Sequence, residues 1–360
     1  MFYHCLKCKN IWQYSIEKCP ECFSPIEKMV SKKAKIIGIS KVNIPTLVHP
    51  KVPYFVLVLE DENGNKWAQK SIKEYKIGEE LKYDASLDSK AVAIWRVKYD
   101  LMEAMEKIIE LLGGINFKKE AKILILPTLL SPKHPYFREN TSPLMLNTLV
   151  EILLGKGIEP SNITVAAQSF TEIPIEASAQ KSGLVSICLK KKINPLDLAK
   201  SNFSKREGKE NLTFEITDEI LKNDLIINLP ILKLDKELDV SGASENLLRL
   251  LKKESYLSLK YLYNEEKIIE SMRDVLSQEF SEKKVLNLAE ARVIQKEIGY
   301  TTYLGLILGS FNPFNLDRVF LEICMTSELR SFFKNIKTED IPIVGRALKE
   351  VQYEVAQFWY

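Results

Sequence analysis

The chain has 360 residues, with 51 basic and 48 acidic side chains and 46% hydrophobic residues. This composition excludes a largely disordered chain and provides enough apolar material for two or three folded domains. The formal net charge of +3 gives no general argument for a nucleic-acid partner, which a strongly basic domain would indicate. No long apolar run and no secretory leader are visible, so we expect a cytoplasmic protein without a membrane partner.

Four of the six cysteines form two Cys-x-x-Cys pairs, Cys5 with Cys8 and Cys19 with Cys22. Each pair makes a tight turn that directs two sulfurs at one point, and two such turns supply the four thiolates of a tetrahedral Zn²⁺ site. Thiolates also bind iron, as in a rubredoxin centre, so iron stays open as an alternative. Because about 30 residues cannot build a core alone, the ion supplies folding energy. We therefore predict a structural zinc ribbon over residues 1–33.

Short strands dominate the next segment, residues 34–86. Apolar runs at residues 54–59 and 66–69 flank Asn63 and Gly64, a pair that is typical of a β-hairpin. Several short strands within about 50 residues predict a small OB-like β-barrel.

Residues 91–335 alternate between apolar strands and helices. The expected strands are residues 91–95, 122–127, 163–167, 224–230 and 284–288, and the expected helices are residues 100–112 and 144–154. Apolar strands that alternate with helices predict a parallel or mixed sheet covered on both faces. A polar stretch at residues 200–211 predicts a mobile loop. The chain as a whole is expected to be multidomain, combining α+β and α/β parts.

The last segment, residues 336–360, has apolar side chains at roughly helical spacing and ends in three aromatic residues. The spaced residues are Val344, Leu348, Val351, Val355 and Phe358. Exposed aromatic side chains would be prone to association, so we expect this helical segment to pack on the body or on a partner chain. A homo-oligomer therefore stays open.

The first 86 residues resemble the family known as domain of unknown function 35, which joins a rubredoxin-like zinc ribbon to an OB-fold. Besides the paired cysteine turns, the matching features are Ile37-Gly38, Pro53-Tyr54, Asn63-Gly64 and Ile77-Gly78-Glu79. Members of that family are similar to accessory proteins of thiolases and hydroxymethylglutaryl-CoA synthases. The resemblance implies a thiolase-like or other acyl-CoA enzyme as partner and acyl-CoA as a bound ligand.

Residues 91 to about 330 resemble domain of unknown function 362, a family whose activity is poorly defined. The resemblance depends on the order of several short motifs, which include Gly113-Gly114, Thr141-Ser142-Pro143, Asn246-Leu247 and residues 309–313 followed by Asp317. The sequence departs from polar positions of the family's pattern at Leu126-Pro127-Thr128, Ala167-Gln168, Asp235, Glu245-Asn246 and Asn312, and Leu126 stands where the family tends to have a lysine. Reaction chemistry depends on such groups, so we expect this domain to lack its relatives' activity. A site built from other residues is the alternative.

Four residues are candidates for ligand binding. Lys233 follows a strand end, where ligands bind in open α/β sheets, and it can meet a phosphate or a carboxylate. Asp235 and Asn246 lie near it in the sequence, and Asp317 can either bind a ligand or pair with Arg318. No catalytic residue is assigned, because the sequence lacks the common nucleotide, hydrolase and zinc-protease motifs.

Together these features predict a non-catalytic, zinc-binding accessory or scaffold protein that acts beside acyl-CoA enzymes of the thiolase or hydroxymethylglutaryl-CoA synthase type. One alternative is an enzyme that acts on a small anionic substrate in the α/β crevice near Lys233 and Asp317. The other is a single-stranded nucleic-acid-binding protein in which Tyr54 and Trp67 stack on bases. The near-neutral charge disfavours this last alternative.

Overall fold

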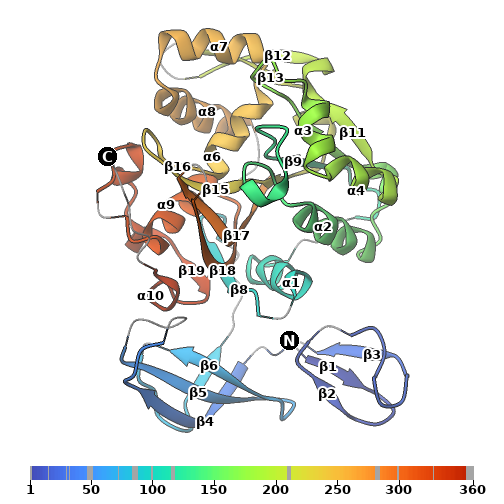
Figure 1. Cartoon of the computed structure of the whole chain (residues 1–360), viewed down its shortest axis with the longest axis vertical. Helices are drawn as coiled ribbons and strands as arrows, with labels where there is room; N and C mark the ends of the chain where they lie inside the picture. The colour runs from blue at the N-terminus through green and yellow to red at the C-terminus, as the bar shows by residue number, and fades with distance from the viewer. Residues whose placement is uncertain are drawn as a thin grey trace.

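The computed structural model describes residues 2–353 apart from residues 15, 30, 32, 47–51, 72, 83–87, 99, 115–117, 209–211, 280–283, 298–299 and 327. These residues form three small antiparallel sheets and one ten-stranded mixed sheet. In Figure 1 the two N-terminal sheets lie below the larger α/β body. None of the helices in this part of the chain has the length and apolar character that crossing a bilayer requires.

The N-terminal sheet contains three short antiparallel strands in the order β2-β1-β3. They are β1 (Phe2–Cys5), β2 (Ile11–Trp12) and β3 (Ile26–Met29). Two turns, one after β1 and one before β3, carry the four N-terminal cysteines. The sheet is therefore the support on which these cysteines are held.

The second sheet is antiparallel and has the order β6-β5-β4-β7. Its strands are β4 (Lys33–Val42), β5 (Tyr54–Asp61), β6 (Lys66–Ser71) and β7 (Glu80–Lys82). The predicted hairpin at Asn63 and Gly64 is confirmed, because β5 and β6 pair on either side of it. Gly64 has a φ of 79°, which glycine adopts at little cost. Among the described residues, β6 and β7 are the two edges of this sheet.

The ten-stranded sheet follows the order β11-β10-β9-β14-β17-β18-β8-β19, and the β15-β16 hairpin joins it at β17. Strands β11, β10, β9, β14 and β17 run parallel, whereas β18 is antiparallel to both β17 and β8. The predicted parallel or mixed sheet is therefore mixed. Its strands are β8 (Val92–Arg96), β9 (Ile123–Pro127), β10 (Ile163–Ala167), β11 (Asn194–Asp197), β14 (Leu225–Leu229), β15 (Ile231–Asp235), β16 (Asp239–Ser241), β17 (Val285–Glu297), β18 (Tyr300–Ser310) and β19 (Ile343–Gly345).

Helices cover both faces of this sheet. One face packs against α1 (Leu101–Leu111), α2 (Pro143–Gly155), α3 (Ile175–Lys181) and α4 (Leu184–Lys191). The other packs against α5 (Glu219–Lys222), α6 (Ala243–Asn246), α7 (Lys253–Leu262), α8 (Glu265–Glu279), α9 (Pro313–Ile323) and α10 (Leu348–Val351). Short 3₁₀ turns connect these elements: η1 (Pro135–Phe137), η2 (Pro160–Asn162), η3 (Leu198–Lys200), η5 (Leu247–Leu250), η6 (Phe332–Asn335) and η7 (Thr338–Asp340).

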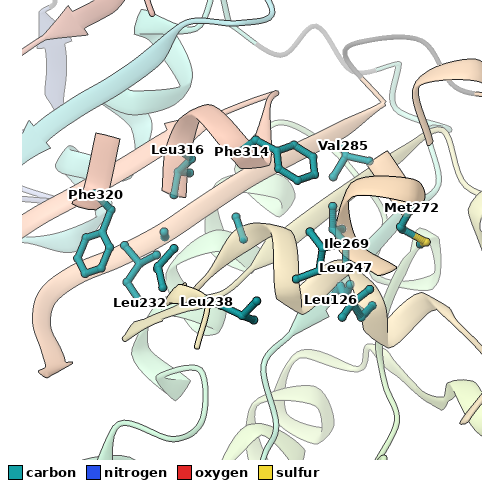
Figure 2. Packing of buried hydrophobic residues seen from close by; sticks show 14 of the residues in the cluster. Leu126, Leu232, Leu238, Leu247, Ile269, Met272, Val285, Phe314, Leu316 and Phe320 are labelled. Atoms are coloured by element: carbon teal, nitrogen blue, oxygen red, sulfur yellow. The ribbon is translucent and has the colours of Figure 1, made fainter. Parts of the chain in front are cut away.

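Strand β9 illustrates why an apolar strand belongs in the middle of such a sheet. Successive side chains of a strand point to opposite faces. Leu124 and Leu126 accordingly join the core on the α6–α9 side, and Ile123 and Ile125 join the core on the α1–α2 side. Figure 2 shows Leu126 close to Leu247 and other apolar side chains from the covering helices. Each such buried side chain contributes roughly 1.5–3 kcal/mol.

Local sequence signals set the ends of α1. The helix begins after Asp100, whose carboxylate accepts the backbone N–H of Glu103 at 2.7 Å. This contact satisfies one of the amide groups that a helix start leaves unpaired. The chain leaves the helix at Gly113 and Gly114, which have positive φ values of 90° and 74°. The predicted helix at residues 100–112 is thereby confirmed.

The predicted loop at residues 200–211 is wrong over part of its length. Phe203–Glu207 forms β12, which pairs with β13 (Thr213–Thr217) in a two-stranded antiparallel sheet. The apolar side chains that anchor this hairpin, Phe214 and Ile216, come from its second strand. A strand whose own residues stay partly exposed can be polar, so polarity was a misleading signal here.

The C-terminal segment contributes one strand and one short helix. Val344 lies in β19, which pairs with β8, whereas Leu348 and Val351 lie in α10 and pack on the core. Residues 354–360, which include Val355 and Phe358, lie outside the described residues.

Candidate functional site

The two Cys-x-x-Cys turns have the same backbone geometry. The C=O of Cys5 accepts the N–H of Lys9 at 3.0 Å, and the C=O of Cys19 accepts the N–H of Phe23 at 2.9 Å. Lys9 and Phe23 both have positive φ values, 63° and 55°. Such a turn leaves the two cysteine side chains of each pair on the same side of the backbone, so the spacing read from the sequence has a direct structural cause.

The four sulfurs of these turns converge. All four Sγ atoms lie within 4.8 Å of one another. The Sγ atoms of Cys5 and Cys22 are 3.3 Å apart, and those of Cys8 and Cys19 are 3.4 Å apart. A tetrahedral ion with metal–sulfur bonds of about 2.3 Å would set its sulfurs about 3.8 Å apart. The cluster is therefore of the size that one metal ion needs, and a small expansion would complete the site.

The electrostatics differ among the cysteines of the cluster. A backbone hydrogen bond from Asn10 lowers the pKa of Cys8, but burial and the neighbouring cysteine side chains outweigh it and raise that pKa. Hydrogen bonds from the Ser24 side chain and backbone lower the pKa of Cys22 to about 6. A backbone hydrogen bond from Cys8 is the largest effect on Cys5 and lowers its pKa below the usual range. Cys5 and Cys19 are buried, whereas Cys8 and Cys22 are partly exposed. Four cysteines with this geometry could bind a metal ion.

The carboxyl ends of β9 and β14 carry a buried polar network that includes the predicted residue Asn246. The Nδ2 atom of Asn246 donates to the Asn228 Oδ1 at 2.7 Å and to the Leu126 carbonyl at 3.1 Å. Its Oδ1 atom accepts from the Thr128 hydroxyl at 2.8 Å. Asn228 in turn donates to Asn287 at 2.8 Å. Asn246 thus joins neighbouring strands through its side-chain amide.

Asn228 and Asn287 were not identified from the sequence, although a signal was present. Both are fully buried, and each interrupts an apolar run, residues 225–229 in β14 and residues 285–289 in β17. A buried amide without partners costs several kcal/mol, roughly 2–7, so an asparagine in such a strand implies a partner elsewhere in the chain. That partner lies 59 positions away, and sequence alone does not reveal it.

The predicted residue Asp317 belongs to α9 and is fully buried, with its carboxylate at the start of α6. Its carboxylate accepts the backbone N–H groups of Ala243 and Ser244 at 2.7 and 2.8 Å and the Ser244 hydroxyl at 2.6 Å. Burial raises the pKa of Asp317 to about 7, although the hydrogen bonds from Ser244 and Ala243 oppose this shift. A Cβ atom at Gly242 would approach the Asp317 Oδ1 to 2.3 Å, so only glycine fits beside it. Asp317 and Asn246 thus meet at the same short helix.

The other two predicted residues lie on the β15-β16 hairpin. Asp235 accepts the backbone N–H groups of Glu237 and Leu238 at 2.9 and 3.0 Å, which closes the turn of this hairpin. Lys233 is half-buried on β15, opposite Ser241. The structure therefore places Lys233 and Asp235 together, and places Asn246 and Asp317 at α6.

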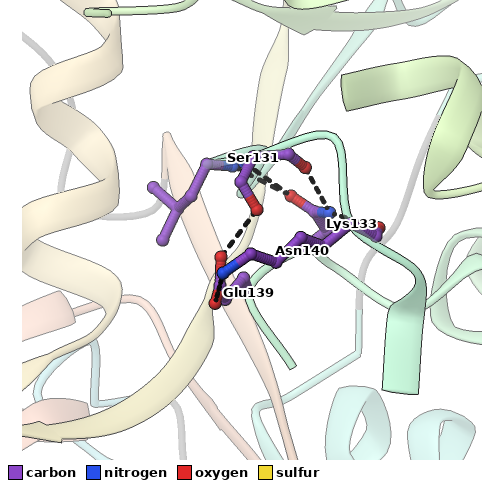
Figure 3. Close-up of polar contacts among 5 residues, drawn as sticks. Ser131, Lys133, Glu139 and Asn140 are labelled. Atoms are coloured by element: carbon purple, nitrogen blue, oxygen red, sulfur yellow. Dashed lines mark hydrogen bonds and ion pairs between the residues drawn. The ribbon is translucent and has the colours of Figure 1, made fainter. Parts of the chain in front are cut away.

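A loop between β9 and α2 faces the charge of Lys233 and is closed by its own hydrogen bonds (Figure 3). Glu139 accepts the Ser131 hydroxyl and the Lys133 ammonium, both at 2.6 Å. Burial opposes ionisation of Glu139, but the hydrogen bonds from Lys133 and Ser131, together with the charges of Lys133 and Lys233, lower its pKa. Asn140 binds the carbonyls of Ser131 and Lys133 at 2.8 and 3.1 Å. These contacts stabilise the loop.

An apolar cavity of about 670 Å³ opens at the carboxyl ends of β9, β10 and β11, between those strands and helices α3 and α4. Most of its lining is aliphatic and includes Leu129, Val165, Ile175, Ala179, Leu184 and Leu196. Three charged residues also line it, and Lys200 pairs with Glu176 at 3.1 Å and with Asp197 at 3.3 Å. Sequence reasoning missed this cavity, because its lining residues read as ordinary core positions.

The fold and these features define a protein in which a four-cysteine cluster that could bind a metal ion is joined to a large mixed α/β domain. The family described as "Domain of unknown function (DUF362)" matches residues 123–322, more than half of the chain. The chain therefore belongs to this family, as the order of motifs in the sequence predicted.

Three solved structures show the range of similarity. The chain covers 75% of a structure titled "Ltp2-ChsH2(DUF35) aldolase" with 28% of its own length, 18% identity and a TM-score of 0.20. It is also similar to the lactate racemase apoprotein from Thermoanaerobacterium thermosaccharolyticum, at 13% identity and a TM-score of 0.38, over 65% of this chain and 57% of that one. A protein from Thermotoga maritima gives 13% identity and a TM-score of 0.35, over 58% and 54%.

The chain thus spans little more than half the length of the last two structures. No curated protein matches the chain.

Proposed function

We propose that this protein is a metal-stabilised, non-catalytic accessory protein that holds the acyl group of an acyl-CoA beside a thiolase-type enzyme. The observation that carries the proposal is the apolar cavity of about 670 Å³ at the carboxyl ends of β9–β11. Ligand pockets of about 300–1,000 Å³ with an apolar lining are typical of small-molecule sites. The resemblance of residues 1–86 to acyl-CoA-associated accessory proteins supports the choice of ligand.

The non-catalytic part of the proposal is supported by how the polar side chains near the sheet ends are used. The Asp317 carboxylate accepts backbone N–H groups at the start of α6. The Asn246 side-chain amide donates to neighbouring strands at Leu126 and Asn228. Asp235 closes a turn. General acid–base catalysis needs a titratable group within hydrogen-bond reach of the substrate, and these groups are already engaged inside the protein.

We further propose that the ion of the four-cysteine centre is zinc, that residues 1–33 form a rubredoxin-like ribbon, and that residues 34–86 form an OB-like barrel. Four thiolates are the donor set of structural zinc sites. The ion in this role folds the ribbon. Metal analysis of the purified protein distinguishes zinc from iron, and an iron–thiolate centre would also be coloured.

Acyl-CoA binding is tested by titration calorimetry with acetyl-CoA and octanoyl-CoA. Each methylene removed from water contributes about 0.8 kcal/mol, so each added pair of carbons is expected to strengthen binding by about tenfold until the cavity is filled. Ala179→Trp places an indole in the cavity and is expected to weaken octanoyl-CoA binding by about tenfold or more. Ala177→Trp is the matched control, because Ala177 lies on the same helix but does not line the cavity.

Three outcomes contradict the proposal. Affinity that is independent of acyl-chain length, or that falls equally in the two tryptophan variants, would exclude the cavity as the acyl site. Steady hydrolysis or transfer of the acyl group by the purified wild-type protein would exclude a non-catalytic role. Partner choice is tested separately by co-purification with a thiolase-type enzyme.

A further inference from the structure

A second pocket lies where all three parts of the chain meet, and we call it the junction pocket. It has a volume of about 100 Å³. The N-terminal sheet contributes Phe2 and Gln13, the second sheet contributes Trp67, and the α/β domain contributes Trp95, Arg96 and Arg346. It shares no lining residue with the apolar cavity.

The charged lining of the junction pocket is strongly unbalanced. Arg96, Lys98, Lys107 and Arg346 line it, against one carboxyl group, that of Glu103. Burial raises the pKa of Glu103, which weakens its value as a counter-charge. Burial, and then the charge of Arg346, lower the pKa of Arg96, although the charges of Tyr303 and Glu350 oppose this shift. The two guanidinium groups therefore lie close enough to repel each other.

Two of these cations have carboxylate partners outside the pocket lining. Lys107 pairs with Glu110 at 2.9 Å, and Arg346 lies 4.0 Å from Glu350. Both also lie over the ring of Trp95, with Lys107 Nζ at 5.8 Å and Arg346 Cζ at 5.1 Å from its centroid. These contacts fix the two cations against one wall of the pocket.

Arg96 differs from its neighbours. Its side chain makes no hydrogen bond or ion pair with any residue that the structure describes, although it is half-buried on β8. An incompletely exposed guanidinium beside a second guanidinium is costly unless an anion compensates it. Glu350 supplies part of this charge, but burial raises its pKa, so a further anion at the two guanidinium groups would be stabilised. The fork of donors on arginine matches the oxygens of a phosphate or carboxylate group.

We propose that the junction pocket binds a phosphate group, either free inorganic phosphate or the phosphate of a small phosphoester. The guanidinium forks of Arg96 and Arg346, with Lys98 in the same lining, match the several oxygens of a phosphate better than the two of a carboxylate. The volume of about 100 Å³ holds one such group, so the remainder of a phosphoester would extend out of the pocket. This site is independent of the proposed acyl cavity.

The test uses titration calorimetry of the full-length, metal-loaded protein with inorganic phosphate, adenosine 5′-monophosphate and unphosphorylated adenosine. Saturable binding of phosphate or of the nucleotide, with no binding of adenosine, is expected. Equal affinity for phosphate and the nucleotide would identify free phosphate as the ligand, and tighter binding of the nucleotide would identify a phosphoester. If neither phosphate nor the nucleotide saturates at millimolar concentrations, the proposal is overturned.

Arg96→Gln is expected to weaken phosphate binding by about tenfold or more, since it removes a charge-assisted contact. Arg206→Gln is the matched control, because it removes the same charge from the distant β12 hairpin at the top of Figure 1. Equal weakening by both variants would indicate general charge screening and overturn the site. Arg96→Lys is the second variant, for use if Arg96→Gln folds poorly. It keeps the positive charge but loses the forked donors of the guanidinium group, so it is expected to bind phosphate with intermediate affinity.

Discussion

At the scale of single residues, the burial of Asp317 predicts how the free energy of unfolding depends on pH. The carboxyl group has an ordinary pKa of 3.8, and burial raises this pKa to about 7 in the folded protein. Below pH 3.8 both the folded and the unfolded chain hold this proton. Between the two pKa values only the unfolded chain releases it, so the free energy of unfolding falls as the pH rises towards about 7 and then stays level.

Asp317→Asn cannot titrate and is expected to remove about 2 kcal/mol of the stability change between pH 5 and pH 8. The measurement is urea denaturation of both proteins at each pH. The matched control is Asp340→Asn, which changes an exposed carboxylate. The amide introduced by Asp317→Asn loses hydrogen bonds at every pH, so a constant offset between the proteins is expected. An unchanged pH slope in this variant would show that Asp317 is ionised in both states.

Residue-level inference from sequence succeeded where the chemistry is local. The four cysteines lie within 18 positions of one another, so their spacing alone predicted the cluster that the structure shows. Asn246 was found only through its place in a family pattern, and its partners Asn228 and Thr128 lie 18 and 118 positions away. Contacts between residues so far apart in the sequence depend on the order of strands in the folded sheet, and local sequence patterns do not specify that order.

At the scale of elements, the close packing of α1 against β18 predicts that a larger side chain at Gly309 destabilises the protein. Gly309 lies on β18 where the helix crosses the strand, and a Cβ atom there would lie 2.3 Å from Ile108 Cγ2. Ile108 is fully buried and β-branched, so it cannot swing aside. Gly309→Ala is therefore expected to destabilise the protein by about 1–3 kcal/mol in chemical denaturation.

Gly155→Ala is the matched control for this change. A Cβ atom at Gly155 would meet nothing within 4 Å, and the residue is the last of helix α2. Alanine is favoured over glycine in helices by up to about 1 kcal/mol, so this variant is expected to be neutral or slightly stabilised. A Gly309→Ala variant as stable as the wild type would show that the strand and helix separate easily at Gly309, and similar destabilisation by both alanines would show that the effect is not specific to the contact with Ile108.

Helices and strands were predictable from sequence where their own residues formed a clear apolar run or an apolar helical stripe. β10 occupies the residues that the apolar run predicted, and α2 differs from its prediction by one residue at each end. The strand at Phe203–Glu207 was missed because its core contacts come mostly from its partner β13. The large cavity was not predictable either, since an aliphatic residue that lines a cavity has the same pattern as one that fills a core.

At the scale of the whole molecule, several contacts join the N-terminal sheet to the other two parts. Gln13 donates to the Lys66 carbonyl at 2.7 Å, and Lys28 of β3 pairs with Glu106 of α1. The rings of Phe2 and Trp67 pack with centroids 5.5 Å apart. Each of these contacts involves the N-terminal sheet, which lacks a sizeable core of its own among the described residues. If the proposed metal ion folds this sheet, its binding is therefore expected to control the junction pocket as well.

Removal of the metal by a chelator tests this coupling. Without its ion the N-terminal sheet is expected to unfold, because metal binding supplies its folding free energy. Loss of Phe2 and Gln13 from the junction pocket then opens one wall, so phosphate affinity is expected to fall by about tenfold. The apolar cavity is lined only by residues from Pro127 to Lys200, so acyl-CoA affinity is expected to stay unchanged in the same sample.

The readouts are titration with both ligands and limited proteolysis, in which cleavage before residue 33 reports the unfolded N-terminal sheet. Addition of Zn²⁺ after the chelator is removed should restore phosphate binding and protease resistance together, whereas Mg²⁺, which prefers oxygen ligands, should restore neither. Cleavage of the N-terminal sheet with unchanged phosphate affinity would show that the α/β domain binds phosphate alone. A parallel loss of both ligands would show instead that the metal stabilises the whole chain, because the apolar cavity contains no residue of the N-terminal sheet.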